Sequence, residues 1–126
     1  MRTLLVIAVI LALLALAGVA WVRLAPSDPQ VWHLDPAAAQ PGPGRFVVRP
    51  EGGDDAGPLL EMPPSEALAA LDAVARASPR TTVLAGSVAE GRITYVTRTP
   101  TVGFPDYTTV EAVPVEGGSR LVIYAR

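Results

Sequence analysis

The residues of this chain best suited to chemistry are an arginine and a short run that follows it. Arg98 lies at the end of a stretch of alternating residues, and Gly103-Phe104-Pro105-Asp106-Tyr107 leads into the next stretch. Glycine admits unusual backbone angles, proline fixes φ and aspartate accepts backbone N–H bonds, so the run predicts a tight turn between strands with Phe104 in the core. The alternative is a polar patch for a ligand or partner, with Arg98 and Asp106 close together at the end of a sheet. We expect the turn, because an Asp–Arg pair is more often structural than catalytic.

Other catalytic and ligand-binding arrangements lack their components. Ser27 or Ser87 with His33 and Asp106 would supply the residue types of a catalytic triad, but no nucleophile elbow surrounds either serine, and His33 lies in a proline-rich stretch. The chain has no Cys and no Lys, which excludes thiolate metal sites, disulfides, a cysteine nucleophile and Schiff-base chemistry. Phosphate-loop, dinucleotide and HExxH motifs are also missing. The sequence therefore predicts no enzyme, no cofactor and no metal site.

Charge argues against a nucleic-acid partner. The formal net charge is −2, and no run of basic residues is present that would bind a phosphate backbone. The sole histidine, His33, follows Trp32, and we expect Trp32 to dock on the folded domain or in the membrane headgroup zone. A role for His33 as a ligand or base is the less favoured interpretation, because it has no cysteine companion.

The first residues predict a membrane segment. Thr3 to Val22 is a run of twenty uncharged, mostly aliphatic residues between Arg2 and Arg23. As a helix it covers roughly 30 Å, the thickness of the hydrocarbon core of a bilayer. We expect residues 1–23 to be a single-pass anchor in the inner (cytoplasmic) membrane, with the N-terminus cytoplasmic and the remainder extracytoplasmic. The alternative is a signal peptide that is cleaved near Gly18, which would release the protein to the periplasm.

The rest of the chain divides by composition at residue 58. Residues 24–58 are rich in proline and glycine and predict a stalk and linker, interrupted by Arg45 to Arg49 as a short edge strand. Residues 59–126 predict a small α+β domain. Its helix spans 63–77, with Leu68, Leu71 and Ala75 on one face and the Asp72–Arg76 pair facing water. Four strands follow in meander order and form an antiparallel sheet under the helix; their ranges are 81–88, 92–99, 107–115 and 120–124.

Several of these segments together resemble a known family. Ala85-Gly86-Ser87, Tyr95-Val96-Thr97-Arg98, Gly103 to Tyr107 and Leu121-Val122-Ile123-Tyr124, with the anchor and Trp32 to Pro36, look like the bacterial domain-of-unknown-function family numbered 1499. The resemblance implies a membrane-anchored protein of the cell envelope and no assigned reaction. It also implies a further C-terminal segment with a closing helix, which this chain lacks. We therefore expect a truncated, marginally stable domain with Val110 and Val122 among the exposed apolar residues of the sheet.

These observations together predict an envelope protein that acts as a binding or interaction module. Its partner would be a protein or lipid of the envelope, reached from a membrane anchor. A lipid- or hydrophobe-binding domain is the alternative, since a helix over a curved sheet leaves room for an apolar cleft. An extracytoplasmic enzyme is the least favoured.

Overall fold

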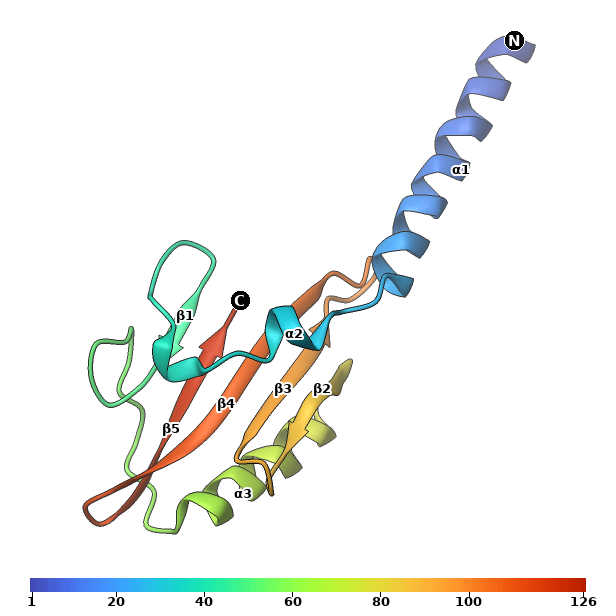
Figure 1. Ribbon diagram of the computed structural model, residues 1–126. Helices are drawn as coiled ribbons and strands as arrows, with labels where there is room; N and C mark the ends of the chain where they lie inside the picture. The colour runs from blue at the N-terminus through green and yellow to red at the C-terminus, as the bar shows by residue number, and fades with distance from the viewer.

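In a computed structural model that describes all 126 residues, the chain forms one long helix joined to an α+β domain (Figure 1). Helix α1, Arg2–Leu24, projects away from the domain and has no buried residue. Its 23 residues, and the mean hydropathy of 2.9 over an 18-residue window within it, make it long and apolar enough to span a membrane. The short helices α2, Pro29–Trp32, and η1, Pro36–Ala38, follow it along the chain.

The domain is built on an antiparallel sheet of five strands rather than four. In spatial order the strands are β1, β5, β4, β3 and β2, and they span Phe46–Val48, Gly118–Ala125, Pro105–Val115, Arg92–Arg98 and Thr81–Ser87. The last four form the predicted meander. The additional strand, β1, is the short segment predicted as an edge strand, and it pairs with β5 through Val47 opposite Tyr124. Val47 is completely buried in this position. The free energy gained by burying its side chain offsets the conformational entropy that the glycine-rich segment loses on joining the sheet.

Helix α3, Pro64–Ala77, packs across one face of this sheet as its apolar spacing predicts. Leu68 is 2% exposed and lies with Ile93, Tyr95 and Val110 in the main core, while Leu71 and Ala75 pack against that group. Prolines suit the first turn of the helix, because the N–H groups there have no intrahelical partner. The core therefore occupies the space between α3 and the four strands β2 to β5.

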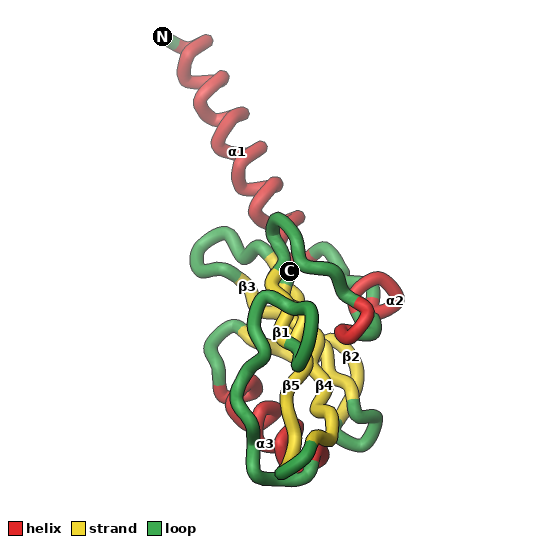
Figure 2. Tube along the Cα trace, turned by 90° about the vertical axis from the view of Figure 1, so that its left-hand side faces the viewer, coloured by secondary structure: helices red, strands yellow, loops and turns green.

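The opposite face of the sheet is covered by the segment between α1 and β1. We call residues 25–39 the strap; it carries α2 and η1, and Figures 1 and 2 show it on the side of the sheet away from α3. Pro36 and Ala39 of the strap are buried. Residues 24–58 are thus a component of the domain, and the predicted boundary at residue 59 does not separate a stalk from it.

Two apolar residues of the sheet that were expected to be exposed are buried. Val110 is 1% exposed and Val122 is 2% exposed. Val110 lies under α3, while Val122 lies on the strap face, and β1 pairs with the outer edge of β5. The expectation that these two residues are exposed is therefore wrong.

Candidate functional site

The predicted turn between β3 and β4 exists and lies against the end of α1. The backbone N–H of Thr99 donates to the carbonyl of Phe104, and Phe104 N–H donates to the Thr99 hydroxyl, both at 2.9 Å. Gly103 has φ of +85°, and a Cβ there would come within 2.9 Å of the Arg23 side chain. Glycine is required on both grounds, so the turn is shaped to receive the end of the helix.

Two details of this turn differ from expectation. Phe104 is 54% exposed rather than tucked into the core, because it lies beyond the last paired residues of the β3–β4 hairpin. Asp106 is exposed and pairs with Thr97, whereas Arg98 pairs with Pro105, so Arg98 and Asp106 point to opposite faces of the sheet. The structure therefore does not bring the predicted Arg98–Asp106 patch together.

Tyr107 serves as the docking point for the strap. Its ring stacks on Trp32 with centroids 3.7 Å apart and planes 7° from parallel, and its hydroxyl lies 2.6 Å from the Ser27 hydroxyl. Trp32 thus docks on the domain, as one of the two expectations held. The guanidinium of Arg126 lies over the Trp32 ring, 5.4 Å from the ring centroid. Burial lowers the pKa of this guanidinium.

His33 also fastens the strap and takes no part in a catalytic arrangement. Its ring nitrogens lie 2.8 Å from the Thr94 hydroxyl and 2.9 Å from the Glu90 carboxylate. Thr94 in turn hydrogen-bonds to the buried Thr109 hydroxyl. No serine or Asp106 contacts His33, so the triad considered from the sequence is not assembled, and every buried side-chain polar atom has a partner.

The strongest concentration of unpaired charge lies where α1 joins the sheet. Three arginines line a cleft of about 340 Å³ there, together with Thr82, Thr99, Thr101 and Gly103, and none of the lining residues is acidic. The arginines are Arg23 at the end of α1, Arg80 just before β2 and Arg98 at the end of β3. We call this cavity the arginine cleft.

Each guanidinium of the arginine cleft donates hydrogen bonds to backbone carbonyls through only some of its N–H groups. Arg98 donates to the carbonyls of Val22 and Gly103 at 3.0 and 2.9 Å, and thereby ties the sheet to the helix. Arg23 donates to the carbonyls of Val102 and Thr101, and Arg80 donates to the carbonyl of Arg98 at 3.0 Å. None of the three forms an ion pair. Their remaining N–H groups have no protein partner and are available to an anion.

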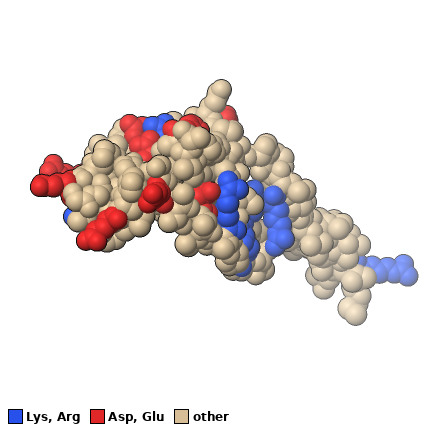
Figure 3. All heavy atoms as spheres, turned by 90° about the horizontal axis from the view of Figure 1, so that it is seen from below, with Lys and Arg blue, Asp and Glu red and all other residues tan.

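Charge is divided along the domain. Figure 3 shows blue arginine side chains gathered near the junction with α1, and red acidic side chains gathered toward the opposite end. Glu90 and Glu116 lie in the turns β2–β3 and β4–β5, at the end of the sheet opposite the arginine cleft. An anion approaching the arginine cleft therefore meets a local positive potential that the net charge of −2 conceals.

Sequence reasoning missed the arginine cleft because its residues are scattered along the chain. One signal was present. Arg80 directly precedes the predicted strand 81–88, and Arg98 lies near the end of the predicted strand 92–99, so antiparallel pairing of the two strands must place these arginines side by side. The backbone of these two residues is indeed hydrogen-bonded at 2.9 Å, from Arg98 N–H to the Arg80 carbonyl. Nothing in the sequence placed Arg23 beside them.

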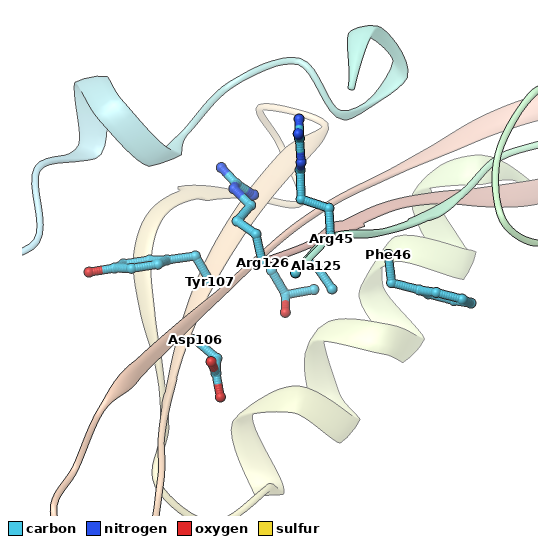
Figure 4. A pocket seen from close by; sticks show the side chains of 8 residues that line it. Arg45, Phe46, Asp106, Tyr107, Ala125 and Arg126 are labelled. Carbon is cyan, nitrogen blue, oxygen red and sulfur yellow. The ribbon is translucent and has the colours of Figure 1, made fainter. Parts of the chain in front are cut away.

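A larger but shallower depression lies at the same end of β1, β4 and β5. It measures about 510 Å³ and includes Arg45, Phe46, Asp106, Tyr107 and Arg126. Figure 4 shows the Arg45 and Arg126 side chains pointing to one side and Asp106 pointing away from them. Arg126 is already engaged by Trp32, Tyr124 and the Thr109 hydroxyl, so this depression offers less binding capacity than the arginine cleft.

Comparison with known proteins adds no assignment: no protein-family model, no curated protein and no solved structure matches this chain. The resemblance to domain-of-unknown-function family 1499 stays a prediction, and function must be argued from the site itself.

Proposed function

We propose that this protein is a membrane-anchored binding module whose arginine cleft holds the phosphate of an anionic lipid headgroup. The observation that carries the proposal is the convergence of three arginines without an acidic partner at the end of a helix long enough to span a bilayer. Guanidinium groups are the preferred protein ligands of phosphate, because their N–H groups match pairs of its oxygens. We favour this function over catalysis, because no His, Asp or Glu lines the cleft that could act as a general base and activate one of its threonine hydroxyls.

The position of the cleft supports a lipid as the source of the phosphate. Arg23 directly follows the apolar run, so its guanidinium would lie at the level of the headgroups when α1 spans the bilayer. Trp21 precedes Arg23 by two residues in α1, and Phe104 follows Gly103 of the cleft; they are 75% and 54% exposed. Aromatic side chains favour the interface between membrane and water, which suits both residues to contact lipid.

The proposed placement is single-pass in the inner membrane, with the N-terminus cytoplasmic and the domain on the extracytoplasmic side. The uninterrupted apolar run to Val22 favours an anchor that is retained in the mature protein. Mass spectrometry of the native N-terminus tests retention, and we expect residues 1–23 to be present. A mature protein that starts at Gly18 or Trp21 would instead be a secreted one, and Arg23 could no longer be held at the membrane.

The binding function is tested with the full chain in lipid nanodiscs. Both lipids carry an anionic phosphate, but in phosphatidylcholine the choline cation balances it, whereas the headgroup of phosphatidylglycerol has a net negative charge. Native mass spectrometry of mixed nanodiscs should therefore show preferential retention of phosphatidylglycerol. We expect a variant with both Arg23→Gln and Arg80→Gln to lose about tenfold in retention, the equivalent of one charge-assisted hydrogen bond. Arg98 is left intact, because it ties the sheet to α1.

Two controls make this result specific. Arg45→Gln removes one guanidinium from an exposed position outside the cleft and should leave retention unchanged. Inorganic phosphate, titrated against the loaded protein, should displace lipid only weakly if the bilayer presents the ligand. Equal retention by the parent protein and the double variant would refute the function, and complete displacement by inorganic phosphate would identify a soluble anion as the ligand.

A further inference from the structure

A second cleft lies between α3 and the sheet at the same end of the domain. It is open to solvent on one side and has a volume of about 450 Å³, within the range of roughly 300–1,000 Å³ that is usual for small-molecule sites. Its walls are apolar side chains of α3, β4 and β5, namely Leu71, Ala75, Val110 and Ile123. Its rim is formed by Ser78, Pro79, Arg80 and Thr81, which connect α3 to β2. We call this cavity the helix–sheet cleft.

Arg80 lines both the helix–sheet cleft and the arginine cleft. The two cavities lie on opposite faces of the sheet and meet around the beginning of β2, where Thr81 lines one and Thr82 lines the other. Arg80 makes this corner with φ of +57°, a left-handed conformation that is uncommon for a residue other than glycine. The exposed Arg80 side chain therefore lies between the arginine cleft and the helix–sheet cleft and lines both of them.

Several polar side chains along the helix–sheet cleft already have hydrogen-bond partners within the protein. The Tyr95 hydroxyl donates to Asp72 at 2.7 Å, and the hydroxyls of Thr81 and Thr97 pair with each other at 2.9 Å. These side chains therefore need no hydrogen bond from a ligand, and the apolar walls of the cleft suit a hydrocarbon chain. A purely polar ligand would gain nothing from entering it.

We propose that the ligand is an amphiphile whose phosphate lies on Arg80 and whose single hydrocarbon chain enters the helix–sheet cleft. This inference rests on the proposed function, because it extends the headgroup site to a whole molecule. Arg98, at the end of β3, contacts the Val22 carbonyl of α1, so the mouth of the helix–sheet cleft lies at the end of the domain that meets the membrane. A lipid would then leave the bilayer by one chain only and keep its headgroup at the interface.

The test uses the full chain in phosphatidylcholine nanodiscs with a long-chain alkyl phosphate that carries a photoreactive diazirine at the end of the chain. After irradiation, mass spectrometry locates the labelled peptides. We expect label on α3 and on β4 or β5, at residues that line the helix–sheet cleft. Ala75→Leu fills the cleft and should lower that label about tenfold, because a packed apolar site rejects added volume. In the mixed nanodiscs of the headgroup experiment, Ala75→Leu should still retain phosphatidylglycerol in preference to phosphatidylcholine, because Arg23 and Arg80 are intact.

The controls separate this inference from the headgroup site. Ala73→Leu makes the same change on the exposed side of α3 and should leave labelling as in the parent protein. If Ala75→Leu fails to unfold cooperatively, Ser78→Leu at the rim takes its place. Label confined to residues 3–22 would overturn the chain site, and the headgroup function would stand if phosphatidylglycerol retention still depended on Arg23 and Arg80. If the helix–sheet cleft is not labelled and phosphatidylglycerol retention does not depend on Arg23 and Arg80, both proposals are refuted.

Discussion

The two faces of the sheet are covered in contrasting ways. On one face a single helix buries Leu68 among Ile93, Tyr95 and Val110, with almost no hydrogen bonding. On the other face the strap is held through individual polar and aromatic contacts, such as Trp32 on Tyr107 and His33 on Thr94. Apolar packing is cooperative and insensitive to direction, whereas hydrogen bonds and stacked rings demand particular geometry. The helix face should therefore carry the stability of the domain, and the strap face should set the position of the anchor relative to the sheet.

The largest expected effect is on the helix face. Leu68→Ala should reduce the free energy of unfolding by about 2–5 kcal/mol, because it leaves a cavity beneath α3 at a residue only 2% exposed. Leu71→Ala should cost less, since Leu71 is only partly buried. Chemical denaturation measures both. Val74, on the same helix but 69% exposed, provides the control, and its replacement by alanine should change stability by less than about 0.5 kcal/mol. An equal loss for Leu68 and Val74 would mean that α3 is not docked as described.

The second effect is on the strap face. Trp32→Ala should cost about 2 kcal/mol, because it removes a partly buried indole, its stacking on Tyr107 and its contact with Arg126. The loss should appear as faster hydrogen exchange of strap amides, while α3 remains protected. Leu34→Ala, at an exposed strap residue, should leave exchange unchanged. Uniform acceleration across the domain would show that the two faces unfold as one unit.

The same contrast explains what could be predicted from the sequence. Residues with a helical or a strand period, such as Leu68 and Ile93, repeat a signal at each turn or pair, so α3 and four strands were predicted close to their observed bounds. The strap has no period. Its contacts join residues 75 positions apart, as from Trp32 to Tyr107, and each depends on the final arrangement of the chain. Phe104 was placed in the core because its hydrophobicity was considered without its position beyond the sheet.

The candidate site follows the same rule. Arg80 and Arg98 could be placed together by hairpin pairing, which is a local consequence of the sequence. Arg23 reaches them only because the strap folds back along the sheet and positions α1 at its end. A site assembled by the irregular part of a chain leaves little trace in composition. For this reason a net charge of −2, which is a sum over the whole chain, gives no sign of a local cluster of arginines.

The smallest expected effect concerns the side-chain hydrogen bond that joins α3 to the sheet. Tyr95 donates to Asp72 at 2.7 Å, and this hydrogen bond, more than the neighbouring Arg76, holds the pKa of Asp72 below its ordinary value of 3.8. The Asp72 side chain is therefore only 16% exposed, where the sequence predicted that it faces water. Tyr95→Phe should cost about 1 kcal/mol at neutral pH, in the range for a hydrogen bond whose acceptor is partly solvated.

The pH dependence gives this small effect a distinctive sign. Because folding lowers the pKa of Asp72, the contribution of its carboxylate is fully present above pH 3.8 and is lost as the pH falls through the lower pKa of the folded state. Burial first, and then Asp72, raise the pKa of Tyr95 above its ordinary value of 10.0, so the contribution of the neutral phenol is present below pH 10.0 and declines above it. Denaturation of the parent and Tyr95→Phe proteins across pH should therefore give stability curves that are separated between these limits and converge outside them. A separation that is constant with pH would mean that Tyr95 acts by packing alone, and that the helix face is as purely apolar as its sequence pattern predicts.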